Sequence, residues 1–380
     1  MAKSLILTAT TAMGIESVTA DELRKLGFSD VTVENGKIIF PADPIDICRT
    51  NLWLRTADRI RLRIGEFKAL TFDELFEQTK KLPWADFLPK NAAFPVTGKS
   101  QKSRLHSVPD CQAIVKKAVV ESMKKRYHEE WFPEDGPVFK IQVALNKDVA
   151  ELSIDTSGAG LHKRGYRKLH NLAPLKETLA SAMIYLSRWT PDRPFTDPFC
   201  GSGTLPIEAA MIGQNIAPGF NRSFVSEDWP LFTAGEWDLA RNEAEDLANY
   251  DQMLAVSGSD IDHQMIDLSE HNAMEAGLSG LISFKQMRVA DFTTKMEYGC
   301  MIGNPPYGER MGSRKEIEQI CRDLGRLFKE NVTWSFYFIS SFEDFESYFG
   351  RHASKKRKLY NGRIRTDYYQ YFGRKKPGNG

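Results

Sequence analysis

Hydrophobic and polar positions follow two different rhythms in the two parts of the chain. In the first part, short apolar or alternating segments predict strands, and longer segments with apolar residues three or four apart predict helices. The expected strands are residues 5–10, 55–67, 94–97, 138–145 and 149–155, residues 31–40 are expected to contain a hairpin turn at Asn35-Gly36, and the expected helices are residues 17–26, 71–81 and 108–126. This mixture of strands and helices is typical of small α+β domains of the ferredoxin-like type.

Beyond a glycine-rich joint at residues 157–160, strand and helix patterns alternate regularly. The expected strands are residues 195–199, 254–258, 282–287, 300–303 and 332–340, the expected helices are residues 204–212, 261–276, 315–329 and 342–349, and residues 358–371 are expected to form a closing hairpin. Regular alternation predicts a parallel, doubly wound sheet, and so an α/β domain. Residues 213–250 interrupt the alternation, and we expect an insertion or a long connection there.

Length and composition are those of a soluble globular protein with two or three domains. The 380 residues are 42% hydrophobic and 27% charged, and no apolar run approaches the ~20 residues that cross a bilayer. The N-terminus has no signal-peptide layout, so the cytoplasm is the expected compartment. Five scattered cysteines without metal-ligand spacing predict free thiols and no metal site.

Charge is distributed unevenly, although the net charge is only +1. Residues 1–170 carry 27 Lys and Arg against 22 Asp and Glu, residues 171–349 carry 14 against 27, and residues 350–380 carry 10 against 1. Two basic ends therefore flank an acidic middle. Basic ends suit a polyphosphate partner, and lysine-rich segments that only aid solubility are the alternative.

A glycine-containing segment follows the first predicted strand of the second part and opens a predicted helix. It reads Asp197-Pro198-Phe199-Cys200-Gly201-Ser202-Gly203-Thr204. The first N–H groups of a helix lack partners within the helix, and the glycines let a ligand approach the main chain. The segment lacks the G-x-G-x-x-G fingerprint of dinucleotide sites and the Gly-Lys-Ser/Thr of a P-loop. It predicts a ligand-binding turn, and a purely structural turn is the alternative.

Acidic residues after the next two predicted strands support a ligand site. Asp260 and Ile261 follow one strand, at a position where a carboxylate suits ribose hydroxyls in doubly wound sheets. Asp291 and Phe292 follow the next strand, where they can pair with an adenine amino group and cover its ring. The alternative for Asp260 is a helix N-cap, although Asp262 fits that position better.

The segment Asn304-Pro305-Pro306-Tyr307 follows the fourth strand of the second part. Two prolines fix φ and make the turn rigid. The Asn304 amide oxygen and the Pro305 carbonyl can accept both hydrogens of a planar amine, and Tyr307 can stack on a base. A base must leave its stack to enter such a pocket, which is easiest in unpaired nucleic acid. A plain surface turn is the alternative.

Residues 197–204 and 304–307 together resemble the motifs of class I amino-methyltransferases that use S-adenosylmethionine. Residues 161–167 and 173–180 are similar to the stretch that leads into this domain in the THUMP-containing RNA guanine-N2 methyltransferases, which have often been labelled adenine-specific DNA methylases. Residues 55–67 and 99–117 resemble the THUMP module, residues 1–50 resemble its N-terminal partner domain, and residues 356–362 also fit. The resemblance spans essentially the whole chain.

The resemblance implies a ferredoxin-like α+β domain at residues 1–54, a THUMP RNA-binding domain at residues 55–160 and a Rossmann-like class I methyltransferase domain at residues 161–380. It implies S-adenosylmethionine as the cofactor and methylation of a guanine 2-amino group, in bacterial large-subunit (23S) ribosomal RNA or a precursor ribosomal particle, without a membrane or a metal. The cofactor-binding candidates are Asp197, Phe199, Cys200, Gly201, Gly203, Thr204, Asp260, Ile261, Asp291, Phe292 and Asn304, and the catalytic candidates are Asn304, Pro305, Pro306 and Tyr307.

Basic residues in the predicted THUMP region are candidates for RNA contacts. They are Lys99, Lys102, Arg104, His106, Lys116 and Lys117. Such side chains can contact phosphates, although a single lysine is often plain solvated surface. Three other functions remain open at this point: a tRNA guanine-N2 methyltransferase, a DNA adenine-N6 methyltransferase and a non-catalytic RNA-binding assembly factor.

Overall fold

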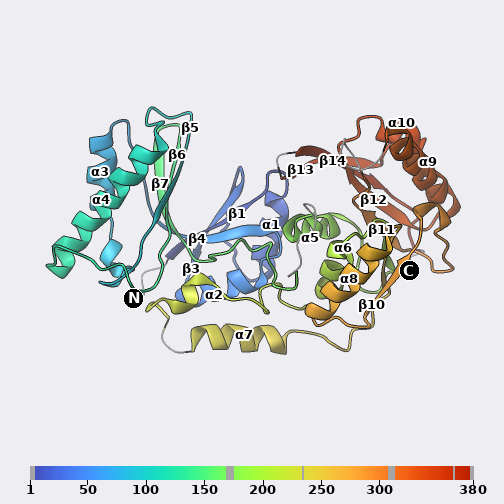
Figure 1. Ribbon diagram of the computed structural model, residues 1–380, viewed down its shortest axis with the longest axis horizontal. Coiled ribbons are helices and arrows are strands. Elements are labelled where there is room, and N and C mark those ends of the chain that lie inside the picture. The colour runs from blue at the N-terminus through green and yellow to red at the C-terminus, as the bar shows by residue number, and fades with distance from the viewer. Residues whose placement is uncertain (1–4, 168–174, 233–234, 307–312, 363, 377–380) are drawn as a thin grey trace.

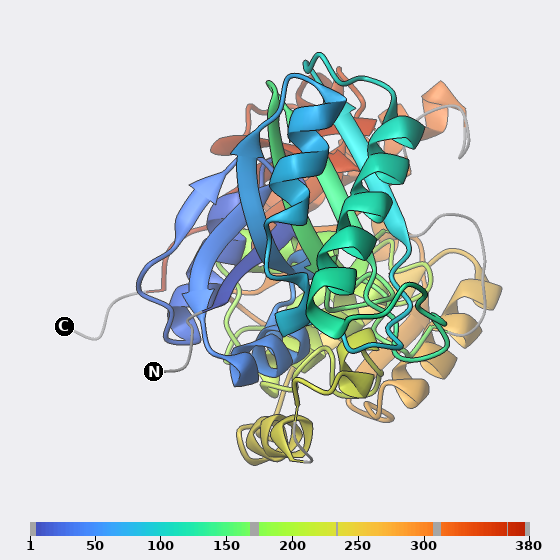
Figure 2. The same cartoon turned by 90° about the vertical axis from the view of Figure 1, so that its left-hand side faces the viewer.

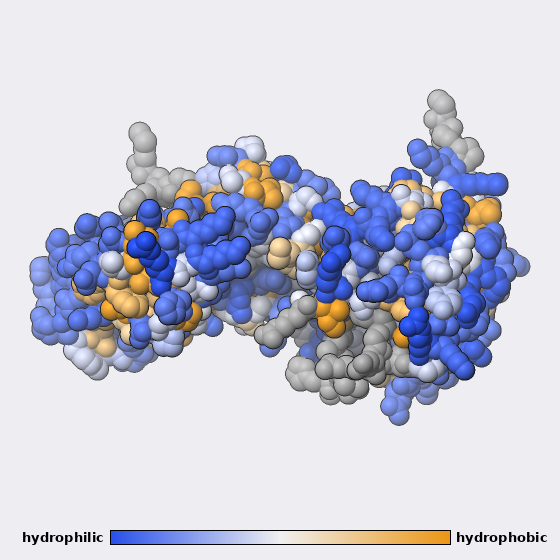
Figure 3. All heavy atoms as spheres, turned by 90° about the horizontal axis from the view of Figure 1, so that it is seen from above, coloured by the Kyte–Doolittle hydropathy of each residue, from blue (hydrophilic) through white to orange (hydrophobic). Residues whose placement is uncertain are grey.

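Two seven-stranded sheets, one in each part of the chain, organise the protein (Figure 1). The computed structural model describes residues 5–167, 175–232, 235–306, 313–362 and 364–376, and the sheets belong to two lobes of an elongated molecule. The face seen in Figure 3 is mainly hydrophilic, with hydrophobic residues in separate small groups. Every helix within the described ranges is too short or too polar to span a bilayer.

The first sheet has the strand order β2-β3-β1-β4-β7-β6-β5. Its strands are β1 (Leu5–Thr11), β2 (Thr32–Glu34), β3 (Lys37–Ala42), β4 (Ala57–Lys68), β5 (Val96–Gln101), β6 (Ile141–Asn146) and β7 (Val149–Asp155), and its helices are α1 (Glu16–Lys25), α2 (Pro44–Trp53), α3 (Phe72–Lys80) and α4 (Val108–Tyr127). The order β2-β3-β1-β4 is the ferredoxin-like arrangement. Because β4 also pairs with β7, the ferredoxin-like and THUMP regions share one continuous sheet.

The first sheet has one apolar face and one polar face. Leu7, Ile60 and Ile154 lie in the hydrophobic core that the four helices cover, and Figure 2 shows α3 and α4 side by side in front of the strands. Alternate residues of a strand point to opposite faces. Arg61 follows Ile60 and therefore points to the polar face. Its cross-strand neighbours, Thr8 on β1 and Asp155 on β7, point to the same face.

Helix α2 was not expected from the hydrophobic pattern, although its start carries a readable signal. Asp43 and Asp46 form a capping box around Pro44 at the first helical position. Two of the buried positions of this ten-residue helix are the polar Thr50 and Asn51. Because these buried positions are polar, the sequence lacks the apolar pattern that would have predicted the helix.

The second sheet confirms the doubly wound α/β prediction, with the order β10-β9-β8-β11-β12-β14-β13. Its strands are β8 (Phe195–Asp197), β9 (Val256–Asp260), β10 (Ile282–Gln286), β11 (Cys300–Gly303), β12 (Ser335–Ser340), β13 (Lys355–Asn361) and β14 (Ile364–Tyr371). The strands from β8 to β12 pair in parallel, and β14 runs antiparallel between β12 and β13. The direction of chain winding reverses between β8 and β11.

Helices cover both faces of the second sheet, as a doubly wound fold requires. They are α5 (Glu177–Leu186), α6 (Thr204–Gly213) and α8 (His263–Glu275) around one core, and α9 (Arg314–Glu330) and α10 (Phe345–Phe349) around another. The two cores hold the strands in place from both sides. Polar groups at the strand ends are therefore carried on a rigid support.

The stretch that interrupts the alternation is an insertion that packs on the N-terminal lobe. It contains α7 (Glu236–Asp246), and an ion pair between Arg49 Nη2 and Glu243 Oε1 (2.9 Å) joins α7 to α2, beneath which it lies in Figure 1. The ring of Trp229 stacks on Phe139 with centroids 4.5 Å apart. The insertion thus completes the core of the first lobe.

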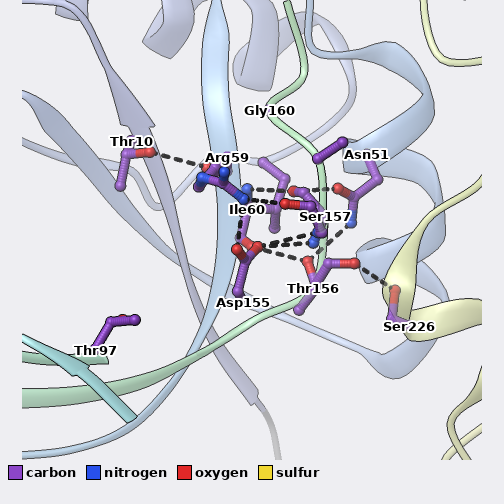
Figure 4. Close-up of polar contacts among 12 residues, drawn as sticks. Thr10, Asn51, Arg59, Ile60, Thr97, Asp155, Thr156, Ser157, Gly160 and Ser226 are labelled. Atoms are coloured by element: carbon purple, nitrogen blue, oxygen red, sulfur yellow. Dashed lines mark hydrogen bonds and ion pairs between the residues drawn. The ribbon is translucent and has the colours of Figure 1, made fainter. Parts of the chain in front are cut away.

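The joint between the lobes is held by buried hydrogen bonds (Figure 4). Ser157 Oγ donates to Asn51 Oδ1 (2.6 Å) and accepts from the N–H of Ile60 (2.9 Å). Thr156 Oγ1 accepts from Asn51 Nδ2 (2.9 Å), and the Thr156 carbonyl accepts from Ser226 Oγ of the insertion (2.8 Å). These bonds fix the start of the joint to the N-terminal lobe and its insertion. The lobes themselves are linked by Arg55, whose Nη2 donates to the carbonyl of Ile216 (2.6 Å) and whose carbonyl accepts from Arg164 Nη2 (2.6 Å).

Candidate active site

The carboxyl ends of three neighbouring strands meet at one edge of the second sheet. Strand β8 ends at Asp197, β9 ends at Asp260, and β11 leads directly into Asn304. β8 pairs with both β9 and β11, so the two segments singled out in the sequence lie at the same edge. This edge is the place where the winding reverses, which is where doubly wound sheets bind ligands.

Close packing at this edge explains two of the glycines. Gly203 begins α6 with φ +82°, and a Cβ atom there would lie 2.9 Å from the Cβ of Ser269. A Cβ atom on Gly303 would lie 3.1 Å from Asp197 Oδ1 and 3.2 Å from Phe199 Cδ2. The end of β11 and the loop after β8 therefore touch, and any side chain at Gly303 would push them apart.

The Asp260 carboxylate links the loop after β8 to the loop after β9. Its Oδ2 accepts from the N–H of Gly201 and its Oδ1 accepts from the N–H of Asp262, each at 3.0 Å. Asp262 is the N-cap of α8 and accepts from the N–H of Gln264 (2.9 Å). Asp262 rather than Asp260 is therefore the helix N-cap, as expected from the sequence.

The Asp197 carboxyl group is almost fully buried at the end of β8, with 2% of the residue exposed. Burial raises its pKa well above the ordinary value of 3.8, the nearby Asp260 carboxylate raises it further, and the N–H of Phe199 (2.9 Å from Oδ1) opposes the shift. A buried carboxyl group of this kind favours a cationic ligand, because a cation restores the charged form.

We expect the replacement Asp197→Asn to make the free energy of unfolding less dependent on pH. The raised pKa means that folded Asp197 keeps a proton that the unfolded chain releases above about pH 4. The wild-type protein therefore loses stability as the pH rises toward the folded pKa, and the amide cannot contribute this loss. Urea unfolding at several pH values between about 4 and 8 measures it. If the unfolding free energy of Asp197→Asn depended on pH as strongly as that of the wild type and of the exposed control Asp251→Asn, this interpretation would be contradicted.

The side-chain oxygen of Asn304 is buried and has no hydrogen-bond partner among the described residues. Buried polar atoms without partners are rare in folded proteins and need an explanation. Pro305, which follows, is buried, and Pro306 is partly buried, so the turn has the rigidity expected from its two prolines. Tyr307, the fourth residue of this motif, lies outside the described residues. Asn304 thus presents a free acceptor beside the loop after β8.

Further polar groups near this edge carry no sequence motif and were missed. The side-chain oxygens of Ser202, Ser259 and Asn272 are buried, and the part of the chain that the structure describes offers them no hydrogen-bond partner. Asn272 Nδ2 donates to the carbonyl of Ser202 (2.9 Å). On the other side of the loop, Arg167 donates to Thr204 Oγ1 (2.5 Å). Asn272 lies on α8 and Arg167 lies before α5, so only the fold brings them to this loop.

The remaining cofactor candidates have different surroundings. Asp291 is exposed at the end of a short 3-10 turn after β10, and Ile261 is 66% exposed next to Asp260. Phe292 is buried and packs against Trp334 with ring centroids 5.6 Å apart. Its ring therefore belongs to the hydrophobic core, whereas Asp291 and Ile261 have surface available for a ligand.

The Cys200 thiol is a packing group in this structure. Burial raises its pKa, and the carboxylates of Asp197 and Asp260 raise it further. A protonated thiol is a poor nucleophile, which agrees with the interpretation of Cys200 as a packed small residue. Within the described ranges, no group of three or more His, Cys, Asp or Glu side chains is arranged to hold a metal ion.

The six candidate RNA contacts do not form one surface. Lys99 lies on β5, on the polar face of the first sheet, paired in register with Ala144. Lys116 lies on α4, where its Nζ pairs with Glu134 (2.5 Å) and sits 3.7 Å from the ring centroid of Phe94. The helix covers the opposite face of the sheet, so one RNA segment cannot contact both residues through a flat surface.

Of the other four candidates, Lys117 lies on α4, and Lys102, Arg104 and His106 lie in the loop between β5 and α4. Lys117 Nζ is 5.9 Å from the ring centroid of Phe76 on α3. In the loop after β5, His106 Nδ1 lies 2.9 Å from the Arg104 carbonyl, and Lys102 has a φ of +51°. This loop is exposed at Lys102, Arg104 and His106 and remains the most accessible part of the predicted basic segment.

Three family descriptions match this chain. Residues 6–61 match the RlmL ferredoxin-like domain, residues 69–155 match the THUMP domain, and residues 164–370 match the RMKL-like methyltransferase domain. The chain is also 56% identical over 377 residues to the Bacillus subtilis (strain 168) protein named "Putative RNA methyltransferase YpsC", a match that covers 99% of this chain and 98% of that protein.

Two solved structures are similar over nearly the whole length. One is described as "a predicted N6-adenine-specific DNA methylase" from Listeria monocytogenes str. 4b F2365, with 55% identity, a TM-score of 0.94 and coverage of 98% of this chain and 97% of that one. The other is SMU.472, "a putative methyltransferase complexed with SAH", with 48% identity, a TM-score of 0.94 and coverage of 99% and 100%. The matches confirm the resemblance and the expected fold, and the chain belongs to the family of THUMP-containing methyltransferases that join an RlmL-type ferredoxin-like domain to an RMKL-like methyltransferase domain.

Proposed function

We propose that this protein transfers a methyl group from S-adenosylmethionine to the exocyclic 2-amino group of a guanine in RNA, with bacterial 23S ribosomal RNA or a precursor ribosomal particle as the substrate. The observation that carries the proposal is the buried, unpartnered amide oxygen of Asn304 beside the loop after β8. No residue in the described ranges donates a hydrogen bond to this oxygen. It fits a hydrogen of a planar amine.

The residues around this edge fit the proposed cofactor. Asp197 offers a carboxyl group that a cationic ligand would ionise, and the backbone around Gly201 and Gly203 lets an adenosine ligand approach closely. Asp260 and Ile261 stand where a ribose and the flat face of an adenine would lie in a doubly wound fold. The bound S-adenosylhomocysteine described for SMU.472 supports the same cofactor class.

S-adenosylmethionine, when bound, supplies an electrophilic methyl carbon and leaves as S-adenosylhomocysteine. The amide oxygen of Asn304 and the carbonyl of Pro305 accept the two hydrogens of the guanine amine, which turns the nitrogen lone pair toward the methyl carbon. With the cofactor bound, this lone pair would take the methyl carbon as the sulfur–carbon bond breaks, and the cationic amine would release its proton to water. Positioning of this kind can remove roughly 7–11 kcal/mol of the barrier. A general base is not required, because the cationic amine loses its proton easily.

The THUMP region supports RNA as the substrate, and YpsC is named as an RNA methyltransferase. The Listeria structure is described as a DNA methylase. Asn-Pro-Pro-Tyr alone cannot separate these substrates, because guanine N2 and adenine N6 are both planar amines. The separate RNA-binding region, fixed to the catalytic lobe by the buried hydrogen bonds of Arg55, favours a folded RNA over a uniform DNA duplex.

Transfer of labelled methyl groups to competing nucleic acids tests the proposed substrate. The purified protein is incubated with tritiated S-adenosylmethionine and with ribosomal RNA, tRNA and duplex DNA, each prepared from a strain that lacks this protein. We expect label in the large ribosomal RNA and only background in tRNA and DNA. Label in DNA alone, or in tRNA alone, would contradict the proposal.

A further inference from the structure

Arg61 is a buried cation without a partner among the described residues. It lies at the centre of β4 on the polar face of the first sheet, only 8% of it is exposed, and its Nε and Nη1 atoms have no hydrogen-bond partner. Its cross-strand neighbour on β1, Thr8, has a buried hydroxyl that also lacks a partner. The carboxylates of Asp155 and Glu151 attract its charge, although neither forms an ion pair with it among the described residues. Buried N–H groups without acceptors are costly, so this arrangement needs an explanation.

The polar face of the sheet is concave around Arg61. Lys37 on β3 and Glu151 on β7 form an ion pair of 2.6 Å between Nζ and Oε2, although β1 and β4 lie between these strands in the sheet. The two side chains can meet only if the sheet curves toward this face. Arg61 and Thr8, which lie on the two intervening strands, therefore form the floor of the concave surface.

Most charges on this face already have partners. Arg59 Nη1 pairs with Asp155 (2.5 Å), Arg63 Nη2 pairs with Glu66 (2.5 Å), and Lys37 pairs with Glu151 and with Glu34. These pairs neutralise the neighbours of Arg61 on both sides. The two carboxylates that attract Arg61, those of Asp155 and Glu151, are therefore already ion-paired with other described residues.

Lys99 is the second cation on this face for which the described residues provide no ion pair. It lies on β5, facing the same side as Glu151 and Arg61. Burial lowers the pKa of its ammonium group, and the positive charges of Arg61 and Lys37 lower it further, while Glu151 opposes the shift. The two cations therefore repel each other, and neither forms an ion pair with a carboxylate of the described residues.

We propose that the concave polar face of the N-terminal sheet binds one phosphate group of the RNA substrate, held by Arg61 and Lys99 with the Thr8 hydroxyl as a further donor. The source of the phosphate rests on the proposed function, whereas the anion site rests on the unpaired cations alone. A phosphate offers several acceptor oxygens to these guanidinium, ammonium and hydroxyl donors. It also carries the negative charge that both cations need.

Inorganic phosphate is the first probe, with the melting temperature of the whole protein as the readout. Phosphate is expected to raise the melting temperature of the wild type above that in sodium chloride of equal ionic strength, by linkage. Arg61→Met is expected to abolish this rise without lowering the melting temperature in chloride, because it removes an unpaired buried charge. Arg63→Met, on the same strand and face but already ion-paired, is expected to keep the rise. An undiminished phosphate rise in Arg61→Met would overturn the site.

RNA binding is the second readout and identifies the source of the phosphate. Arg61→Met and Lys99→Met are each expected to weaken RNA binding about tenfold or more and to reduce the slope of log K against log salt by roughly 0.7–0.9. Arg63→Met is expected to change the slope much less. Loss of the phosphate rise with unchanged RNA affinity would overturn the RNA assignment. If Arg61→Met loses the phosphate rise but the wild-type protein methylates no RNA, the proposed function is refuted and the anion site stands.

Discussion

Replacing Asn304 with alanine is expected to lower the rate of methyl transfer about a hundredfold to a thousandfold, the range seen when one positioned hydrogen-bonding group is removed from an active site. The amide oxygen of Asn304 is buried and unpartnered, so its loss exposes no new polar group in the folded chain. The target amine would lose the acceptor that orients its lone pair. Single-turnover kinetics with saturating RNA and cofactor measure the chemical step directly.

RNA affinity and thermal stability distinguish this effect from a folding defect. Both are expected to stay close to wild type in Asn304→Ala, and the exposed control Asn249→Ala is expected to keep its activity as well. Asn304→Asp retains an oxygen acceptor and is expected to retain more activity than the alanine variant. Equal loss of activity and of RNA binding in Asn304→Ala would show that the residue supports the fold rather than the reaction.

Replacing Glu208 with alanine is expected to destabilise the protein by about 3–5 kcal/mol, because it leaves the partner cation buried and unpaired. Glu208 on α6 is fully buried, and its carboxylate oxygens each lie 3.2 Å from the guanidinium of Arg164. Arg164 also donates to the carbonyl of Arg55 in the N-terminal lobe (2.6 Å). The ion pair therefore joins the two lobes directly behind the candidate active site.

Urea unfolding of the whole chain measures this loss, and a double variant separates charge from packing. Glu208→Leu combined with Arg164→Met removes both charges and keeps most of the volume, so it is expected to recover a large part of the stability. A Glu208→Ala variant with an unchanged unfolding midpoint would contradict the structural role of the pair. A double variant less stable than Glu208→Ala would show that the hydrogen bonds of Arg164 dominate.

The sequence predicted well those features that depend on neighbouring residues. The strand ends at Asp197, Asp260 and Gly303 follow from local apolar runs and turn residues, and parallel strands necessarily present these ends at one edge. The fold class and the position of Asn304 beside the loop after β8 follow from the same reasoning. Whether these residues bind the cofactor and the base stays a prediction that the variants above test.

Features that depend on distant residues could not be predicted. Residues 213–250 carry no local sign that Trp229 stacks on Phe139 in the other lobe. The burial of Phe292 against Trp334 likewise depends on a strand far along the chain. Hydrophobic contacts carry little directional information in the sequence, so only the assembled core identifies the partner.

Charge alone was a poor guide to the RNA-binding surface. The alternation of arginines in residues 55–67 predicted a basic face on a strand, which β4 confirms. Arg63 pairs with Glu66 on its own strand, whereas Asp155 on β7, which lies opposite Arg61 in the register, pairs with Arg59 instead. Lys116 is equally basic in sequence but is paired with Glu134. Partners, rather than charges, decide which cations remain available to a ligand.

Identification of the methylated nucleoside tests the central claim most directly. Ribosomal RNA from a strain that lacks this protein is methylated by the purified enzyme, digested to nucleosides and separated by chromatography with mass detection. The account predicts N2-methylguanosine as the product, and no product with the Asn304→Ala variant. N6-methyladenosine as the only methylated nucleoside would contradict it.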